Sequence, residues 1–217
     1  MRKIFLDCGA HDGCSVRMFE KIYDDKKEYE VYSFEGSTSQ RLGSLQKYHQ
    51  KNCYKFKKNE VIPKLVWIFD GKVSFNGWNQ SIKQFSSVDT PNTGFPAVVE
   101  SLDFSKWIKD NFNKDDYIVL KMDIEGAEYE VLNKMIKDGT MSYINKFYGE
   151  LHGLKKGFSV QETNTLIDKI NNKYNLKVWN WDAQDELDGK EVDPYKKNEF
   201  EEVIKIEDET VEWKGKG

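Results

Sequence analysis

The residues best suited to chemistry are the acids that follow an apolar segment in the second half of the chain. Tyr117–Leu120 is a near-continuous apolar run, and Asp123, Glu125 and Glu128 come soon after it. Three carboxylates at one strand-to-helix junction cost electrostatic energy unless a cation or a shared proton lies among them. The attraction of a helix N-terminus for acids explains Glu128 equally well, but it does not explain Asp123 at the end of a buried strand.

A second polar pair occurs in the segment KFYGELHG, residues 146–153. Because side chains alternate along a strand, Glu150 and His152 would share one face near its carboxyl end. We identify Asp123, His152 and Glu150 as catalytic candidates, with Asp123 or His152 as a general base. On this segment alone, a partly buried histidine without a chemical role is the simpler interpretation of His152.

The same group of side chains carries the ligand atoms that a divalent cation needs. In this alternative hypothesis, Asp123, Glu125, Glu150 and His152 bind the cation, which polarises a bound substrate. Carboxylates with one imidazole suit Mg²⁺ or Mn²⁺ better than a soft metal.

The first residues of the chain combine glycines with carboxylates. The apolar run Ile4–Leu6 leads into DCGAHDG, residues 7–13, and the apolar positions that follow have helical spacing. A dinucleotide site would have the pattern G-x-G-x-x-G, but His11 replaces its middle glycine and Asp7 would repel a pyrophosphate. The same carboxylate would attract the amino group and the sulfonium of S-adenosylmethionine (SAM). A glycine-rich turn that binds no ligand is the alternative.

Two later segments add candidates for a cofactor site. Glu35 and Gly36 follow an apolar segment, and Glu35 lies 22 residues past Gly13. Nucleotide-binding α/β folds place an acid on the ribose hydroxyls at about that separation. Trp67 is either an adenine contact or a core residue. The cofactor-binding candidates are therefore Asp7, Gly9, Ala10, His11, Gly13, Glu35, Gly36, Trp67 and Asp123.

These candidates converge only if the apolar segments are parallel strands of one sheet. Each candidate acid ends or follows a segment short enough to be a buried strand. In open α/β sheets, ligands bind beyond the carboxyl ends of the strands. We therefore expect one rim of the sheet to carry Asp7, Glu35, Asp123, Glu150 and His152.

The remaining apolar segments complete the predicted sheet. We expect Val66–Ile68 to occupy its third position, and the pair Asp70-Gly71 to close a hairpin with the next strand. Leu176–Trp181 and Phe200–Ile206 are predicted to form an antiparallel pair at the edge, because no helix separates them.

Length and composition limit the class of protein. The 217 residues suffice for one α/β domain, so we treat 1–217 as a single domain. Residues 76–95 are polar and aperiodic, which indicates a loop that contacts the acceptor, and residues 207–217 are expected to be a frayed tail. The net charge of -4 and the scattered lysines argue against a nucleic-acid partner. Unpatterned cysteines and the lack of a membrane-spanning or signal-like run lead us to expect a cytoplasmic protein.

Six segments taken together resemble the FkbM-type SAM-dependent methyltransferases. They are FLDCGAHDG, YSFEG, LVWIFDGKVSF, ESLDFSKWI, LKMDIEGAEYEVL and YGELH, which occur in this order over residues 5–152. The resemblance implies an α/β, Rossmann-like class I methyltransferase fold, with a seven-stranded mostly parallel sheet and helices on both faces. It also implies a SAM-dependent O-methyltransferase that acts on a hydroxyl, commonly of a sugar or another natural product.

The resemblance also implies roles by position. Asp7, Gly9 and Gly13 would hold the methionine part of SAM, and Glu35 the ribose hydroxyls. The segment DIEGAE matches the acidic block of the family. Gly36 stands where many members have a proline, a difference that the turn should tolerate.

Two rival classes stay open. A non-catalytic SAM- or nucleotide-binding module, such as a partner subunit, would have the same turn. An NAD-dependent oxidoreductase is disfavoured by His11 and Asp7. The expected partner is a small-molecule or glycan acceptor, and the sequence identifies neither that acceptor nor the oligomeric state.

Overall fold

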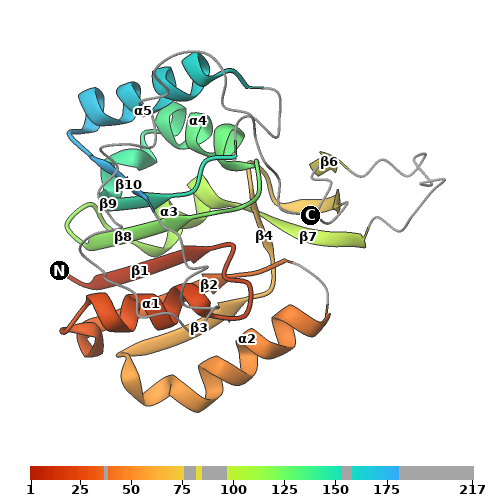
Figure 1. The fold of residues 1–217 in the computed structure, drawn as a ribbon, viewed down its shortest axis with the longest axis vertical. Coiled ribbons are helices and arrows are strands. Elements are labelled where there is room, and N and C mark those ends of the chain that lie inside the picture. The colour runs from red at the N-terminus through yellow and green to blue at the C-terminus, as the bar shows by residue number, and fades with distance from the viewer. Residues whose placement is uncertain (37–38, 76–81, 85–96, 153–157, 181–217) are drawn as a thin grey trace, which may run out of the picture.

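The main sheet brings the ends of the predicted strands side by side. The computed structural model describes residues 1–36, 39–75, 82–84, 97–152 and 158–180. Among these residues, six strands form one sheet in the order β10-β9-β8-β1-β2-β3 (Figure 1), and every neighbouring pair is parallel. Its strands are β1 Lys3–Cys8, β2 Tyr29–Phe34, β3 Lys58–Ile62, β8 Tyr117–Met122, β9 Ile144–Gly149 and β10 Val178–Asn180. The α/β class and the mostly parallel sheet are confirmed.

A second sheet of four strands has the order β4-β7-β5-β6. Its strands are β4 Leu65–Trp67, β5 Gly71–Phe75, β6 Ile82–Gln84 and β7 Ala97–Asp103. The expectation that Val66–Ile68 takes the third position of the main sheet is therefore wrong, because β3 occupies it. Pro63 follows β3 directly and has no N–H for a further ladder bond, and the chain turns there into the second sheet.

The predicted hairpin at Asp70-Gly71 is also wrong. Strand β7 lies between β4 and β5, parallel to β4 and antiparallel to β5. The connection is held by β7 itself: the Ser101 hydroxyl donates to the carbonyl oxygens of Phe69 and Gly71, and the Asp103 N–H donates to Asp70. Contacts with a distant strand thus determine the path of this turn.

The strand count and the edge of the main sheet differ from the prediction. The described residues form six strands in this sheet and not seven, since β4 belongs to the second sheet. Strand β10 pairs in parallel with β9, and its predicted antiparallel partner at 200–206 lies outside the described residues. The tail 207–217 also lies outside them, as does the predicted acceptor loop 76–95 apart from β6.

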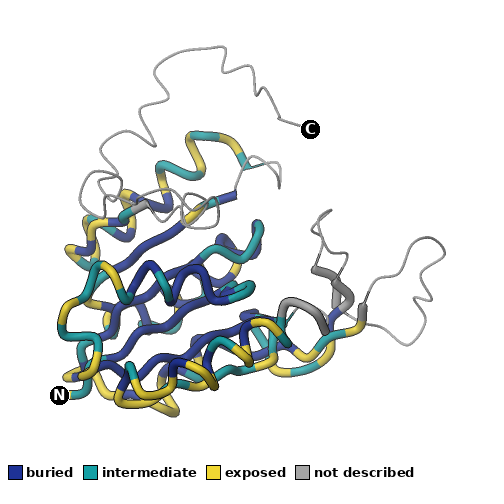
Figure 2. The backbone as a smooth tube through the Cα atoms, turned by 60° about the horizontal axis from the view of Figure 1, so that its bottom comes forward, coloured by how far each residue is buried: buried dark blue, intermediate teal, exposed yellow. Residues whose placement is uncertain are grey.

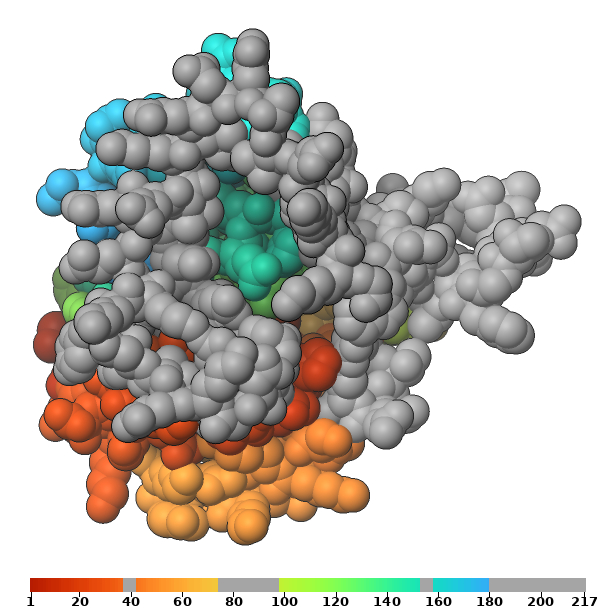
Figure 3. Space-filling model, viewed as in Figure 1, coloured from red at the N-terminus to blue at the C-terminus, as the bar shows by residue number. Residues whose placement is uncertain are grey.

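Alternation along the strands gives each face of the main sheet its own helices. The helices are α1 Cys14–Ile22, α2 Ser39–Asn52, α3 Phe104–Asn111, α4 Glu128–Asp138 and α5 Val160–Tyr174. Phe5 and Val119 pack in a cluster with residues of α1, whereas Leu6 and Leu120 pack with residues of α3, α4 and α5. The strands run through the buried interior (Figure 2), and α2 forms the lower, orange surface of the space-filling view (Figure 3). Helices on both faces are therefore confirmed.

Buried His49 makes the stability of this fold depend on pH. The side chain lies on α2 with 5% exposure, and neither ring nitrogen has a hydrogen-bond partner among the described residues. Burial lowers the pKa of His49 to about 4. The unfolded chain takes up a proton near pH 6.5 and the folded chain does so only near pH 4, so the stability present above pH 6.5 is lost as the pH falls between these values.

We expect His49→Leu to remove this part of the acid sensitivity. The contribution is at most about 3 kcal/mol between pH 7 and pH 4. Urea unfolding at both pH values, for the wild type and the variant, measures it. An equal loss of unfolding free energy in both proteins would contradict the assignment to His49.

Candidate functional site

The glycine turn after β1 folds against the loop that follows β8. Gly9, His11 and Gly13 have φ angles of 79°, 51° and 94°, in the left-handed region that favours glycine. The N–H of Gly9 donates to the carbonyl oxygen of Phe34 at 3.1 Å. A Cβ on Gly9 would lie 1.8 Å from the carbonyl oxygen of Asp123, so only glycine permits this contact between the two loops.

The end of β2 supports the other side of the turn. The backbone N–H of His11 donates to Oε2 of Glu35 at 2.8 Å, and Glu35 is 8% exposed. Ala10 is fully buried. A Cβ on Gly36 would lie 2.4 Å from Cγ of Leu65, so this glycine lets β4 begin close to the end of β2. The turn and the predicted ribose-binding acid are therefore neighbours.

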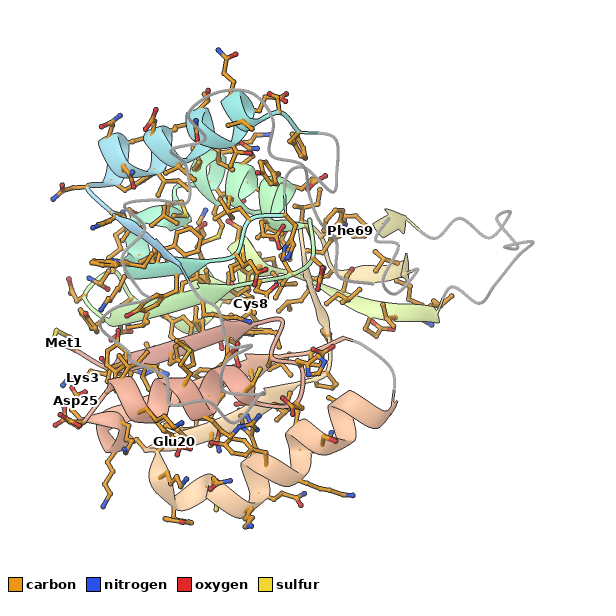
Figure 4. The ribbon with its side chains drawn as sticks, in the orientation of Figure 1. Met1, Lys3, Cys8, Glu20, Asp25 and Phe69 are labelled. Carbon is orange, nitrogen blue, oxygen red and sulfur yellow. The ribbon has the colours of Figure 1, made fainter. Side chains whose placement is uncertain are left out.

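Lys121 is a buried cation that the sequence analysis missed. Its Nζ donates to the carbonyl oxygens of Gly9 at 2.8 Å and Cys8 at 3.3 Å, and lies 3.4 Å from Asp7 and 3.6 Å from Asp123. Cys8, labelled in Figure 4, marks the end of β1 at this point. Burial opposes a charge on Lys121, but the carboxylates of Asp123 and Asp7 outweigh it and raise the pKa of the amine. The sequence contained a signal for this buried cation, namely a lysine within an otherwise apolar strand.

The structure places Glu35, Asp123 and Glu150 just after strand ends, on the predicted rim. Asp7 does not lie on this rim. Cys8 is in register with Phe34 of β2 and with Met122 of β8, so these strands end together. Asp7 is fully buried one residue earlier and forms an ion pair with Lys121. It therefore supports the turn from inside the sheet and does not reach the rim. Trp67 lies at 9% exposure in the main core cluster.

His152 lies among four carboxylates. Nδ1 is 3.2 Å from Glu128 and 3.9 Å from Asp123, and Nε2 is 3.2 Å from Glu150 and 3.8 Å from Glu125. Burial disfavours the charged ring, but hydrogen bonds with Glu128 and Glu150 overcome this effect and raise the pKa of His152 to about 10. As long as only carboxylates face it, the ring is protonated at neutral pH and cannot accept a proton. This ionisation disfavours His152 as the general base.

Asp123 connects the turn with the histidine cluster. Its side chain is 28% exposed, and its carboxylate lies between Lys121 and His152. Burial raises the pKa of Asp123 to about 6, although Lys121 acts in the opposite direction. A carboxylate with a pKa near neutrality is suited to accept a proton from a bound hydroxyl. Of the three catalytic candidates, Asp123 therefore fits the role of base best.

Glu128 belongs to the cluster rather than to the helix surface. It is the first residue of α4 and is fully buried, and its Oε1 accepts the backbone N–H of Ile124 at 2.8 Å. The attraction of the helix N-terminus does not explain this burial. The sequence held a signal: Glu128 precedes the apolar positions Val131 and Leu132 by three and four residues, which places it on the buried side of the helix.

Comparison with known proteins agrees with this arrangement. None of the described helices has the length and apolar character needed to cross a bilayer. Searches of curated proteins and of solved structures find no match. A family model, the methyltransferase FkbM domain, matches residues 7–177, a range that contains the whole turn and the whole histidine cluster. Because this match covers more than half of the chain, the protein belongs to the FkbM methyltransferase family.

Proposed function

We propose that this methyltransferase transfers the methyl group of SAM to a hydroxyl of a sugar or glycan. The choice of acceptor rests on the resemblance of the sequence to this family, and the observation that supports methyl transfer at this point is the direct contact between the glycine turn and the loop of Asp123. Gly9 packs on the backbone of Asp123, and Lys121 binds both. A donor on the turn and an acceptor beside Asp123 would therefore be neighbours, as in-line methyl transfer requires.

The turn and the end of β2 are the residues that would hold SAM. The turn takes its shape from the positive φ angles at Gly9 and Gly13, whose missing side chains let it pack on Asp123 and Tyr48. Glu35, at the end of β2, could accept the ribose hydroxyls. The sequence analysis expected Asp7 to repel a pyrophosphate and to attract the cationic groups of SAM. We assign this role to Asp123, because its carboxylate is partly exposed and would attract an ammonium or a sulfonium. When bound, SAM supplies a methyl group on a positive sulfur, which forms a C–O bond as the C–S bond breaks.

Asp123 is the group to which we assign the acceptor proton. It is the carboxylate shared by the turn and the histidine cluster, and Lys121 and His152 flank it on two sides. These neighbours hold the carboxylate in place while part of it stays accessible. A sugar hydroxyl is a poor nucleophile at neutral pH, so removal of its proton should speed the transfer.

Transfer of labelled methyl from SAM to sugars and mixed glycans tests the function directly. We expect label in the acceptor fraction that depends on the protein. A non-catalytic SAM-binding module would bind SAM in calorimetry and leave the acceptors unlabelled. Binding of NADH without binding of SAM would favour an oxidoreductase and contradict the proposal.

Asp123→Asn tests the base. We expect kcat to fall by ~10²–10⁴, because the amide cannot take the acceptor proton. Asp115→Asn is the matched control, since Asp115 is an exposed aspartate just before the other end of β8. Turnover is measured at saturating SAM, and the affinity for SAM is measured separately by calorimetry. Wild-type turnover in Asp123→Asn with the correct acceptor would remove Asp123 from the reaction.

Gly9→Ala tests the turn as the donor site. The new Cβ would meet the carbonyl oxygen of Asp123 at 1.8 Å, so we expect the two loops to separate and SAM binding to weaken by about tenfold or more. Gly139→Ala is a matched control, because Gly139 has φ 78° against 79° for Gly9 and a Cβ on it would meet no neighbouring group within 4 Å. Equal SAM affinities of the two variants, measured by calorimetry, would contradict the assignment of the donor site to the turn.

A further inference from the structure

Three side chains from different elements bring one ligand atom each to a single point. Asp123 follows β8, Glu128 begins α4, and His152 follows β9. Their ligand atoms all lie within 4.8 Å of one another. Such separations allow one ion to contact all three, since oxygen and nitrogen ligands lie about 2.0–2.6 Å from Mg²⁺, Mn²⁺ or Ca²⁺.

The two sides of the His152 ring have different partners. Nδ1 faces the buried side of the cluster, 3.2 Å from Glu128 and 3.9 Å from Asp123. Nε2 faces the half-exposed carboxylates of Glu150 at 3.2 Å and Glu125 at 3.8 Å. A histidine that binds a metal through one nitrogen commonly donates its other N–H to a carboxylate. Glu150 is placed to accept that bond and to leave Nδ1 directed at the other two ligands.

The environment of the Glu128 carboxylate is a second, independent observation in favour of a bound cation. The side chain has no exposed surface, and its Oε1 accepts the N–H of Ile124 and lies against Nδ1 of His152. Its second oxygen, Oε2, is buried with no hydrogen-bond partner among the described residues. A buried carboxylate oxygen without a partner is costly. A cation bound through Oε2 would remove that cost.

We propose that Asp123, Glu128 and Nδ1 of His152 bind one divalent cation, and that Glu150 orients the ring from the opposite side. The ligand set differs from the sequence expectation, because Glu128 replaces Glu125 and Glu150 as a ligand. Two carboxylates with one imidazole suit Mn²⁺ or Mg²⁺. The chemical consequence rests on the proposed function: the cation would polarise an acceptor hydroxyl bound beside Asp123, and Asp123 would then act as a ligand of the cation in place of its role as the base.

Binding of Mn²⁺ alone, without SAM or acceptor, tests the site. The loss of the electron paramagnetic resonance signal of free Mn²⁺ should give one site per chain, and Mg²⁺ should compete for it. We expect Glu128→Gln to weaken Mn²⁺ binding by about tenfold or more, and Glu150→Gln by ~10–100-fold. Glu130→Gln is the matched control, since Glu130 lies in the same first turn of α4 but is exposed. Its Mn²⁺ affinity should equal that of the wild type.

Circular dichroism and thermal unfolding exclude misfolding as the cause of any loss. If Glu128→Gln does not fold, Glu150→Gln decides the question, because that side chain is half-exposed. The proposal is overturned if the wild type binds no Mn²⁺, or if Glu130→Gln weakens binding as much as Glu128→Gln.

Activity separates this inference from the proposed function. Methyl transfer that is lost in EDTA and restored by Mn²⁺ supports a cation at the reacting hydroxyl, whereas transfer that survives EDTA contradicts that consequence. Site-specific Mn²⁺ binding in a protein that transfers no methyl group to any acceptor would refute the proposed function and leave the cation site intact.

Discussion

One buried ammonium group holds together the two loops on which the candidate site is built. Nζ of Lys121 binds the carbonyl oxygens of Cys8 and Gly9 in one loop and faces Asp123 in the other. It also compensates Asp7, which has no exposed surface. Removal of one member of such a buried pair leaves an isolated charge and is strongly destabilising. The positions of the donor turn and of the candidate base are therefore coupled.

The sheet makes this coupling possible because β1 and β8 are parallel neighbours. Asp7 is in register with Lys121, so the pair forms directly across the two strands on the face covered by α1. Beyond the strand ends, the backbones cross so closely that Gly9 cannot carry a side chain. The second loop has its own left-handed residues, Glu125 at φ 58° and Gly126 at φ 98°. Backbone in such regions persists only where its surroundings determine it.

Asp123 stands between two different environments. On one side, Lys121 is paired with the buried carboxylate of Asp7 beside the glycine turn, and on the other, His152 brings together Glu128 from α4 and Glu150 from the end of β9. A reaction that unites a cationic donor with a hydroxyl acceptor needs both, because the donor needs a close backbone cradle and the acceptor needs a group that stabilises its developing negative charge.

Local patterns predicted the glycine turn, the strands of the main sheet except β3, and the rim at their ends, because these depend on neighbours in the sequence. The apolar run at β8 and the spacing of α1 both follow from short-range periodicity. The family match agrees with the fold inferred from them. The second sheet was not predictable in this way, since β7 separates β4 from β5 through contacts between distant residues.

The sequence by itself determined which residue types stand at the strand ends, and hence the class of fold and the kind of chemistry. Only the tertiary structure decided which charges meet. It buried Asp7 against Lys121, moved Glu128 from the helix surface into the cluster, and surrounded His152 with carboxylates. The physical reason is that charge interactions depend on distance and burial, and both are set by the packing of segments that lie far apart in the chain.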